Sequence, residues 1–141
     1  MTLNWSLWDK VSAIVREVGI YQMEKFRTKS TASGVEKTLR EMVSEVDINS
    51  EKMLIENLQK LLPEAGFYGE EGGRQGSREH YWLIDPLDGT TNYLSGLEQF
   101  SISVAYIENG QVHGGLVYRP ACGETFAAVR GAGFRHNGLE L

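Results

Sequence analysis

The chain has 141 residues, of which 41% are hydrophobic and 23% charged, and its formal net charge is -5. This size and mix predict one globular domain with a core of its own. The acidic balance, without any run of Lys and Arg, argues against nucleic acid and anionic membrane as partners. An acidic protein can still hold a phosphorylated substrate when metal cations stand between its carboxylates and the phosphate.

The N-terminal half is predicted to be helical. Residues 4 to 27 form an amphipathic helix, because apolar side chains recur at helical spacing: Trp5, Trp8, Val11, Ile14, Val15, Val18 and Phe26. Residues 28 to 38, TKSTASGVEKT, are polar and predict a loop leading to a short extended piece. Ser44 and Asp47 resemble a capping box and predict the start of a second helix that stops at Pro63.

The second half changes to short strands. Aromatic and β-branched residues are dense in GFYGEE, HYWLID, FSISVAYI, VHGGLVYR and TFAAVRG. Asn109-Gly110 and Asn137-Gly138 are two-residue hairpin signals, and RPACGE supplies a third turn. The expected fold class is α+β, with two helices packed on an antiparallel sheet in a single domain.

The ends of the chain and its single cysteine bear on the compartment. The first ten residues, MTLNWSLWDK, lack the basic and apolar regions of a signal peptide, and no window is apolar enough to cross a bilayer. Cys122 has no second cysteine for an internal disulfide, which agrees with a reducing compartment. We therefore expect a cytoplasmic protein.

Acidic residues collect at two predicted strand ends. Glu70 and Glu71 end one strand, while Asp85 and Asp88 end the strand that begins at Tyr81. If these strands are neighbours, the carboxylates repel and raise one another's pKa values unless cations neutralise them. Oxygen ligands without a Cys or His cluster favour Mg²⁺ over zinc or a redox metal.

The segment WLIDPLDGTTNY, residues 82 to 93, continues this pattern. Pro86 stiffens the backbone between the two aspartates, which can leave the Leu87 carbonyl facing the same way as both side chains. Gly89 lets the backbone approach a ligand closely. Thr90-Thr91 can open a short helix whose free N–H groups would cradle a phosphate.

Each of these features also has a purely structural interpretation. D-P-L-D-G is a good β-turn sequence, and Glu70-Glu71 alone resemble a solvated strand end. Asp47 alone is explained as a helix N-terminal charge. The histidines show no ligand spacing and are expected at the surface or in loops: His80, His113 and His136. The residues alone leave the structural and metal-binding interpretations open.

Longer motifs in register carry a resemblance to a known family. GEE at residues 69 to 71, followed by WLIDPLDGTTNY, closely resembles the signature of the inositol monophosphatase family. VSEVD at residues 43 to 47, GLVYRP and RGAGFRHNG match further family motifs. Members of this family are Mg²⁺-dependent, lithium-sensitive phosphatases that share an architecture with fructose-1,6-bisphosphatase. The similarity runs over nearly the entire chain.

The resemblance implies a role for each motif residue. Mg²⁺ would be bound by Glu70, Asp85, Asp88 and the Leu87 carbonyl. The substrate-contacting positions would be Leu87, Asp88, Gly89 and Thr90, with the backbone N–H groups of Gly89 and Thr90 on the phosphate. Thr90 and Asp47 would orient the metal-activated water that attacks phosphorus, and Glu70 would help to activate it.

The resemblance also implies a substrate and shows departures. GTTNY is similar to the inositol monophosphatase branch, so we expect hydrolysis of inositol monophosphate to inositol and phosphate. Ser44 stands where Thr is usual, and Glu41 where the family often has Asp or Asn. The family's C-terminal α/β half, with its W-D-x-A motif, is absent from these 141 residues.

We therefore expect the isolated chain to be inactive unless a complementing C-terminal half is supplied, and a homodimer is a second possible assembly. The alternatives are a non-catalytic metal-binding or protein-binding remnant, or a phosphatase for another sugar or nucleotide phosphate.

Overall fold

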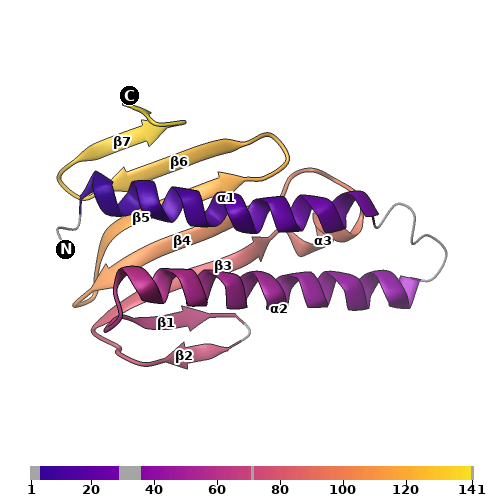
Figure 1. Cartoon of the computed structure of the whole chain (residues 1–141), viewed down its shortest axis with the longest axis horizontal. Helices are drawn as coiled ribbons and strands as arrows, with labels where there is room; N and C mark the ends of the chain where they lie inside the picture. The colour runs from indigo at the N-terminus through magenta and orange to yellow at the C-terminus, as the bar shows by residue number, and fades with distance from the viewer. Residues whose placement is uncertain (1–3, 29–35, 71, 141) are drawn as a thin grey trace.

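The structure, a computed structural model, describes residues 4–28, 36–70 and 72–140. Two long helices, α1 (Trp5–Thr28) and α2 (Glu36–Leu61), lie side by side on the same face of one sheet (Figure 1). Among the described residues, no helix is long and apolar enough to cross a membrane. The expected α+β arrangement of helices packed on a sheet is confirmed.

The first helix matches its prediction and the second does not begin where expected. α2 starts at Glu36, so Ser44 and Asp47 lie inside the helix, and the predicted capping-box start is wrong. The expected loop is also wrong at residues 36 to 38, and so is the short extended piece that was to follow it, because α2 runs through both, while residues 29–35 lie outside the described residues. Lys, Leu, Arg, Glu and Met between residues 36 and 42 are strong helix formers, which explains the earlier start. α2 ends at Leu61, two residues before Pro63 as predicted.

The sheet has eight strands in the order β2-β1-β3-β4-β5-β6-β7-β8. The strands are β1 (Gly66–Gly69), β2 (Gly73–Gln75), β3 (His80–Asp88), β4 (Ser101–Glu108), β5 (Gln111–Arg119), β6 (Glu124–Val129), β7 (Gly133–His136) and β8 (Leu139–Glu140). Neighbours pair antiparallel except β1 and β3, which are parallel, so the sheet is mixed rather than wholly antiparallel. A short helix, α3 (Thr90–Leu94), follows β3.

The Asn-Gly hairpin predictions are confirmed by the backbone. Asn109 and Gly110 join β4 to β5 with φ angles of 51° and 78°. Asn137 and Gly138 join β7 to β8 with φ angles of 52° and 81°. Positive φ at both central residues is the requirement of the two-residue turn that matches strand twist.

The main core lies between the helices and the inner face of the sheet. Trp8 of α1 meets Trp82 of β3 edge to face, with ring centroids 5.9 Å apart. A Cβ on Gly114 would stand 2.6 Å from the Trp8 ring, so glycine at this position of β5 leaves room for the indole. A second buried cluster packs beneath the end of β3 and comprises Val43, Val46, Leu87, Tyr93 and Phe100.

The opposite face of the sheet, called here the outer face, carries apolar side chains that remain exposed: Tyr68, Leu83, Val112, Val117 and Phe134. They line one broad, open groove of about 920 Å³. Glu70 and Asp85 line the same groove, so the predicted acidic site opens onto this face.

Candidate metal and phosphate site

The parallel pairing of β1 and β3 brings the two acidic strand ends together. Gly69 of β1 lies opposite Ile84 of β3, so the next residue of each strand is an acid, Glu70 and Asp85. Parallel neighbours finish at the same edge of a sheet, whereas antiparallel neighbours finish at opposite edges. Glu70 and Asp85 thus lie at neighbouring strand ends, as expected. The pairing of β1 with β3 is parallel, however, and not antiparallel as predicted.

A β-bulge brings Asp88 to the same place. Asp85 pairs with Ser103 and Asp88 with Ser101, so three residue steps on β3 oppose two on β4. The extra residue lies at Pro86-Leu87, where a proline is tolerated because the ladder is interrupted. D-P-L-D is therefore the bulged end of a strand and not a free β-turn.

The surroundings of Asp85 disfavour its ionised form. Burial raises its pKa above the ordinary value of 3.8, and the charges of Asp88 and Glu70 raise it further, while a hydrogen bond from the Leu87 backbone N–H lowers it. Its Oδ1 is buried and has no hydrogen-bond partner in the part of the chain that the structure describes. Two negative charges that act on Asp85, and its buried oxygen without a donor among the described residues, are what a cation would relieve.

The backbone after Asp88 approaches its neighbours closely. Gly89 has φ 93°, and a Cβ there would stand 2.8 Å from the Gln99 carbonyl oxygen. Gly89 precedes α3, and no side chain caps its first N–H groups. The Tyr93 N–H donates to the Gly89 carbonyl at 2.9 Å, and Thr90 is exposed. The predicted short helix at Thr90 is confirmed.

Asp47 comes from the helix layer and not from the strand ends. Asp47 lies on α2 and is 7% exposed, in the helix layer beside the second core cluster. The acids whose charges raise the pKa of Asp85 are Asp88 and Glu70. Glu71 lies outside the described residues.

Two buried polar residues support the site and were missed by sequence reasoning. Glu51 of α2 is 5% exposed, and its Oε2 accepts a hydrogen bond from the Gly72 N–H at 3.1 Å, next to the turn that carries Glu70. Gln22 of α1 is fully buried and donates from Nε2 to the Pro86 carbonyl oxygen at 2.7 Å. The available signals were an acid four residues after Asp47 and an amide four residues after Val18 on an apolar helix face.

The donor set fits a hard divalent cation, without forming a closed cage. Within residues 4–28, 36–70 and 72–140, no group of three or more His, Cys, Asp and Glu side chains lies close enough to hold a metal ion. Mg²⁺ does not need such a cage, because it keeps several waters and is usually held by one or two carboxylates with substrate phosphate. Asp85, with its buried unbonded oxygen beside two further acids, matches that requirement.

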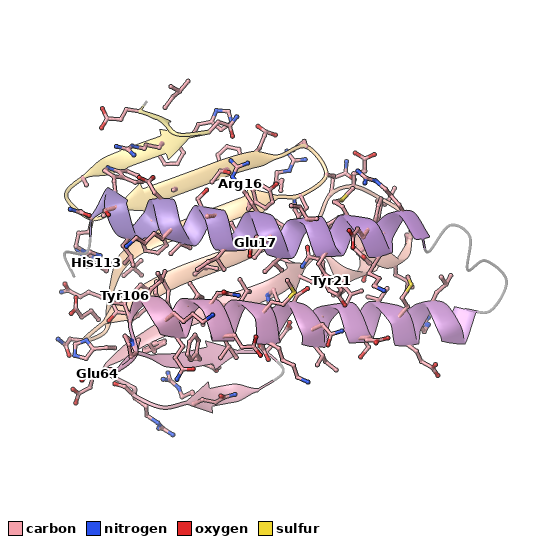
Figure 2. The ribbon with its side chains drawn as sticks, viewed as in Figure 1. Arg16, Glu17, Tyr21, Glu64, Tyr106 and His113 are labelled. Atoms are coloured by element: carbon pink, nitrogen blue, oxygen red, sulfur yellow. The ribbon has the colours of Figure 1, made fainter. Side chains whose placement is uncertain are left out.

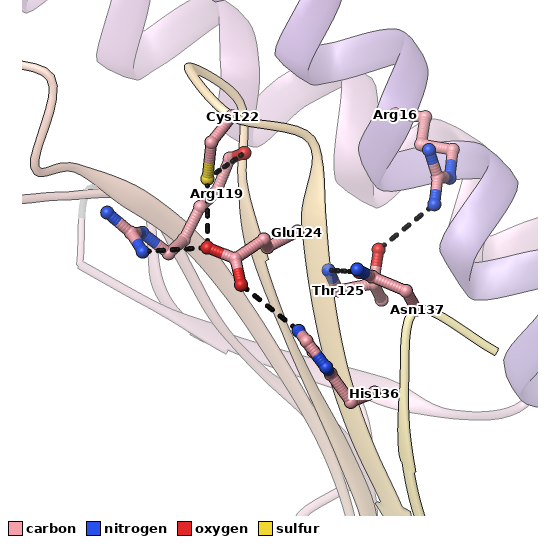
Figure 3. A network of polar contacts seen from close by, with 7 residues as sticks. All are labelled: Arg16, Arg119, Cys122, Glu124, Thr125, His136 and Asn137. Carbon is pink, nitrogen blue, oxygen red and sulfur yellow. Dashed lines mark hydrogen bonds and ion pairs between the residues drawn. The ribbon is translucent and has the colours of Figure 1, made fainter. Parts of the chain in front are cut away.

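A second polar cluster lies at the β5–β6 turn (Figure 3), and two of its strands, β5 and β6, are separated from β3 by β4. Glu124 is bonded at 3.0 Å by Arg119, at 3.2 Å by the Cys122 thiol and at 3.0 Å by His136. These hydrogen bonds, that of Cys122 first, lower the pKa of Glu124. Arg119 supplies the positive charge of this cluster, and His136 connects the turn to β7. We therefore interpret the cluster as structural.

Comparison with known proteins gives consistent results. The model of the inositol monophosphatase family matches residues 6–141. The Nus factor SuhB of Xylella fastidiosa is 37% identical over 118 residues, covering 84% of this chain and 43% of that protein. The fructose-1,6-bisphosphatase/inositol-1-monophosphatase of Thermotoga maritima is 42% identical over 103 residues, covering 72% of this chain and 40% of that protein.

Solved structures agree with these relatives. The extragenic suppressor protein suhB of Bartonella henselae superposes with a TM-score of 0.82 at 28% identity, over 96% of this chain and 52% of that one. The Thermotoga maritima IMPase gives a TM-score of 0.79 at 33% identity, over 95% of this chain and 52% of that one. The chain thus spans less than half the length of the two curated relatives and about half of the solved chains.

Proposed function

Because the chain belongs to the inositol monophosphatase family, we propose that it carries the metal-binding and phosphate-binding wall of a Mg²⁺-dependent phosphomonoesterase. The proposed reaction is the hydrolysis of inositol monophosphate to inositol and phosphate, in the cytoplasm. The observation that carries the proposal is Asp85, whose buried Oδ1 lacks a hydrogen bond in the described part of the chain and whose carboxylate is crowded by Asp88 and Glu70.

Four positions at the ends of β1 and β3 would hold the cation: Glu70, Asp85, Asp88 and the Leu87 carbonyl. When bound, Mg²⁺ neutralises phosphate charge and makes water a better nucleophile. The bulge supports this assignment because it puts Asp85 and Asp88 on the same face of the sheet despite their spacing of three along a strand.

The backbone after the bulge would receive the phosphate. The N–H groups of Gly89 and Thr90 are free of side-chain caps and follow directly after Asp88. The exposed Thr90 hydroxyl would orient the attacking water together with Asp47, and Glu70 would accept its proton.

We further propose that residues 1–141 act as the N-terminal domain of a larger fold, whose C-terminal α/β part packs on the outer face. The exposed apolar side chains of that face support the proposal, as does the half-length match to the solved chains. Without the C-terminal α/β part, the phosphate would be contacted from one side only, and catalysis requires tighter positioning of the reacting groups. We therefore expect negligible turnover of inositol 1-phosphate by residues 1–141 alone.

The names of the relatives support two other candidates. Relatives from Xylella fastidiosa and Pasteurella multocida are named Nus factor SuhB. This name favours a Nus factor role as an alternative, in which the chain would bind a partner other than a small molecule. The Thermotoga maritima relative is also named a fructose-1,6-bisphosphatase, which favours another sugar phosphate as substrate. In either case the acidic site would keep its composition.

Calorimetric titration with Mg²⁺ or Mn²⁺ tests the metal site directly. The wild-type chain is expected to bind, and Glu70→Gln to bind at least about tenfold more weakly, because a ligand carboxylate is lost. Glu64→Gln is the matched control, since Glu64 is exposed and lies at the end of the molecule opposite α3 (Figures 1 and 2). Equal affinity in all three proteins would remove Glu70 from the ligand set.

A further inference from the structure

Gln22 connects three parts of the molecule from a fully buried position on α1. Its side-chain Nε2 donates to the Pro86 carbonyl oxygen at 2.7 Å and to Ser50 Oγ of α2 at 3.0 Å. Its backbone carbonyl accepts a hydrogen bond from the Tyr93 hydroxyl at 2.7 Å. Burial raises the pKa of that hydroxyl, so Tyr93 remains a donor at every physiological pH.

The bond from Gln22 acts on one particular peptide unit. Pro86 C=O and Leu87 N–H belong to the same trans peptide, in which the two groups point in opposite directions. Gln22 holds the C=O on the inner side, so the N–H points to the outer side, and the Leu87 backbone there lowers the pKa of the Asp85 carboxylate. The orientation of this peptide therefore decides how the Asp85 carboxylate is held.

We propose that Gln22 is a positioning residue, which sets the Pro86-Leu87 peptide and through it aims Asp85 at the cation. The inference rests on the proposed metal site for its consequence, but the effect on the peptide does not depend on any metal. It assigns to α1 a part in the site, although α1 contributes none of the expected metal ligands.

The cost of keeping an amide at this position supports the inference. Gln22 Oε1 is buried and has no hydrogen-bond partner among the described residues. Burying an amide oxygen without a donor is unfavourable, and an apolar side chain of similar volume would avoid that penalty. The donation to Pro86 is the interaction that such a replacement would remove.

Gln22→Met tests the inference, with Ser50→Ala as the matched control. Methionine keeps the volume of glutamine and adapts to the same space but has no donor. Ser50→Ala removes the other bond of the same Nε2 and leaves the bond to Pro86 in place. Gln22→Met loses both hydrogen bonds of Nε2, whereas Ser50→Ala loses only the bond to Ser50, so a difference between the two variants reports the bond to Pro86.

The primary readout is amide hydrogen exchange of the metal-free chain, followed by NMR. In Gln22→Met, the Leu87 amide is expected to exchange about tenfold faster relative to the amides of β4, because its hydrogen bond is no longer held in place. In Ser50→Ala this ratio stays at the wild-type value. An unchanged Leu87 ratio in Gln22→Met, or an equal change in both variants, would overturn the inference.

A second measurement needs no variant and applies if Gln22→Met does not fold. In the wild-type chain, the two side-chain amide hydrogens of Gln22 are expected to exchange at least about tenfold more slowly than those of the exposed Gln111. Equal exchange would show that the Gln22 amide is not bonded and would contradict the proposal.

Mn²⁺ titration then separates this inference from the proposed function. Gln22→Met is expected to bind Mn²⁺ more weakly by about tenfold, the usual lower bound for loss of a residue that orients a ligand, and Ser50→Ala to bind as the wild type does. If Gln22→Met binds Mn²⁺ with wild-type affinity, the proposed effect of the Pro86-Leu87 peptide on cation binding is wrong. If the wild-type chain binds no Mn²⁺, the proposed metal site fails, while the exchange ratios still decide whether Gln22 orients the peptide.

Discussion

Asp85 combines burial, two acidic neighbours and an oxygen without a donor among the described residues, so in the absence of metal it destabilises the fold. Its folded pKa lies above its unfolded value, which means that the folded state binds the proton more tightly. The resulting cost is present at neutral pH and is relieved as the pH falls through the folded pKa toward 3.8. A residue that weakens the fold where the proposed ligand binds is typical of a functional site.

Asp85→Asn is therefore expected to stabilise the metal-free chain. The gain should be modest, about 1 kcal/mol or less, because Asp85 is partly exposed and solvent screens the repulsion. The melting temperature would rise by a few degrees at pH 7 and less at pH 4. Added Mg²⁺ should raise the melting temperature of the wild type but not of the variant. A lower melting temperature for metal-free Asp85→Asn would contradict the electrostatic account.

At the scale of elements, the junction from β3 to α3 depends on one glycine. Gly89 has a positive φ, and its Cα faces the backbone of Gln99 and Phe100, which a Cβ would meet at 2.8 and 3.3 Å. Those contacts are with backbone atoms, so no side-chain rotation relieves them. The loop from Asp88 into α3 can approach β4 only without a side chain at this position.

Gly89→Ala should destabilise the chain by about 2–4 kcal/mol, from left-handed backbone strain plus the contact with Gln99. Gly110→Ala is the matched control, because Gly110 also has a positive φ but nothing lies within 4 Å of its Cβ position. That control should lose only about 1–2 kcal/mol. Urea unfolding measures both, and equal losses would show that the contact at Gly89 is of no consequence.

Sequence patterns predicted most of these elements but not all of their limits. Helical spacing identified α1, and Asn-Gly pairs identified two hairpins, because both signals are local. The start of α2 was wrong, since Ser44 and Asp47 satisfy a capping pattern that an uninterrupted helix also contains. No sequence pattern predicted the strand β2, because GRQ carries neither alternation nor β-branched residues.

The whole molecule presents one covered and one uncovered face of its sheet. α1 and α2 lie on the inner face (Figure 1). The outer face keeps exposed apolar side chains, and Glu70 and Asp85 line the same groove as these side chains. An exposed apolar surface of this kind usually marks an interface. Its continuity with the acidic site explains why a domain packed there would also complete the site.

A chimera tests catalysis at this scale. Residues 1–141 would be joined to the segment of the Thermotoga maritima relative that follows its matched part, since the two folds superpose with a TM-score of 0.79. The chimera is expected to release phosphate from inositol 1-phosphate with Mg²⁺ at least about 10²-fold faster than the isolated chain, because both walls now hold the substrate.

Asp88→Asn in the same chimera is the control and should abolish the release. A chimera that melts cooperatively yet releases no more phosphate than residues 1–141 would contradict the proposed function.

The sequence by itself determined the identity of the acids, their positions at strand ends and the resemblance that assigns them roles. These properties are local, because hydrophobic period, turn chemistry and motif spacing each depend on residues a few positions apart in the sequence. The acids Glu70, Asp85 and Asp88 could thus be named before any contact was known.

Only the tertiary structure decided that these acids meet. Whether β1 pairs parallel or antiparallel with β3 depends on how the chain crosses between them, and the parallel pairing is what puts Glu70 beside Asp85. The bulge at Pro86-Leu87 and the bond from Gln22 likewise join residues far apart in sequence. Non-local contacts of this kind leave no periodic signal, because the energy that selects them comes from packing of the whole core.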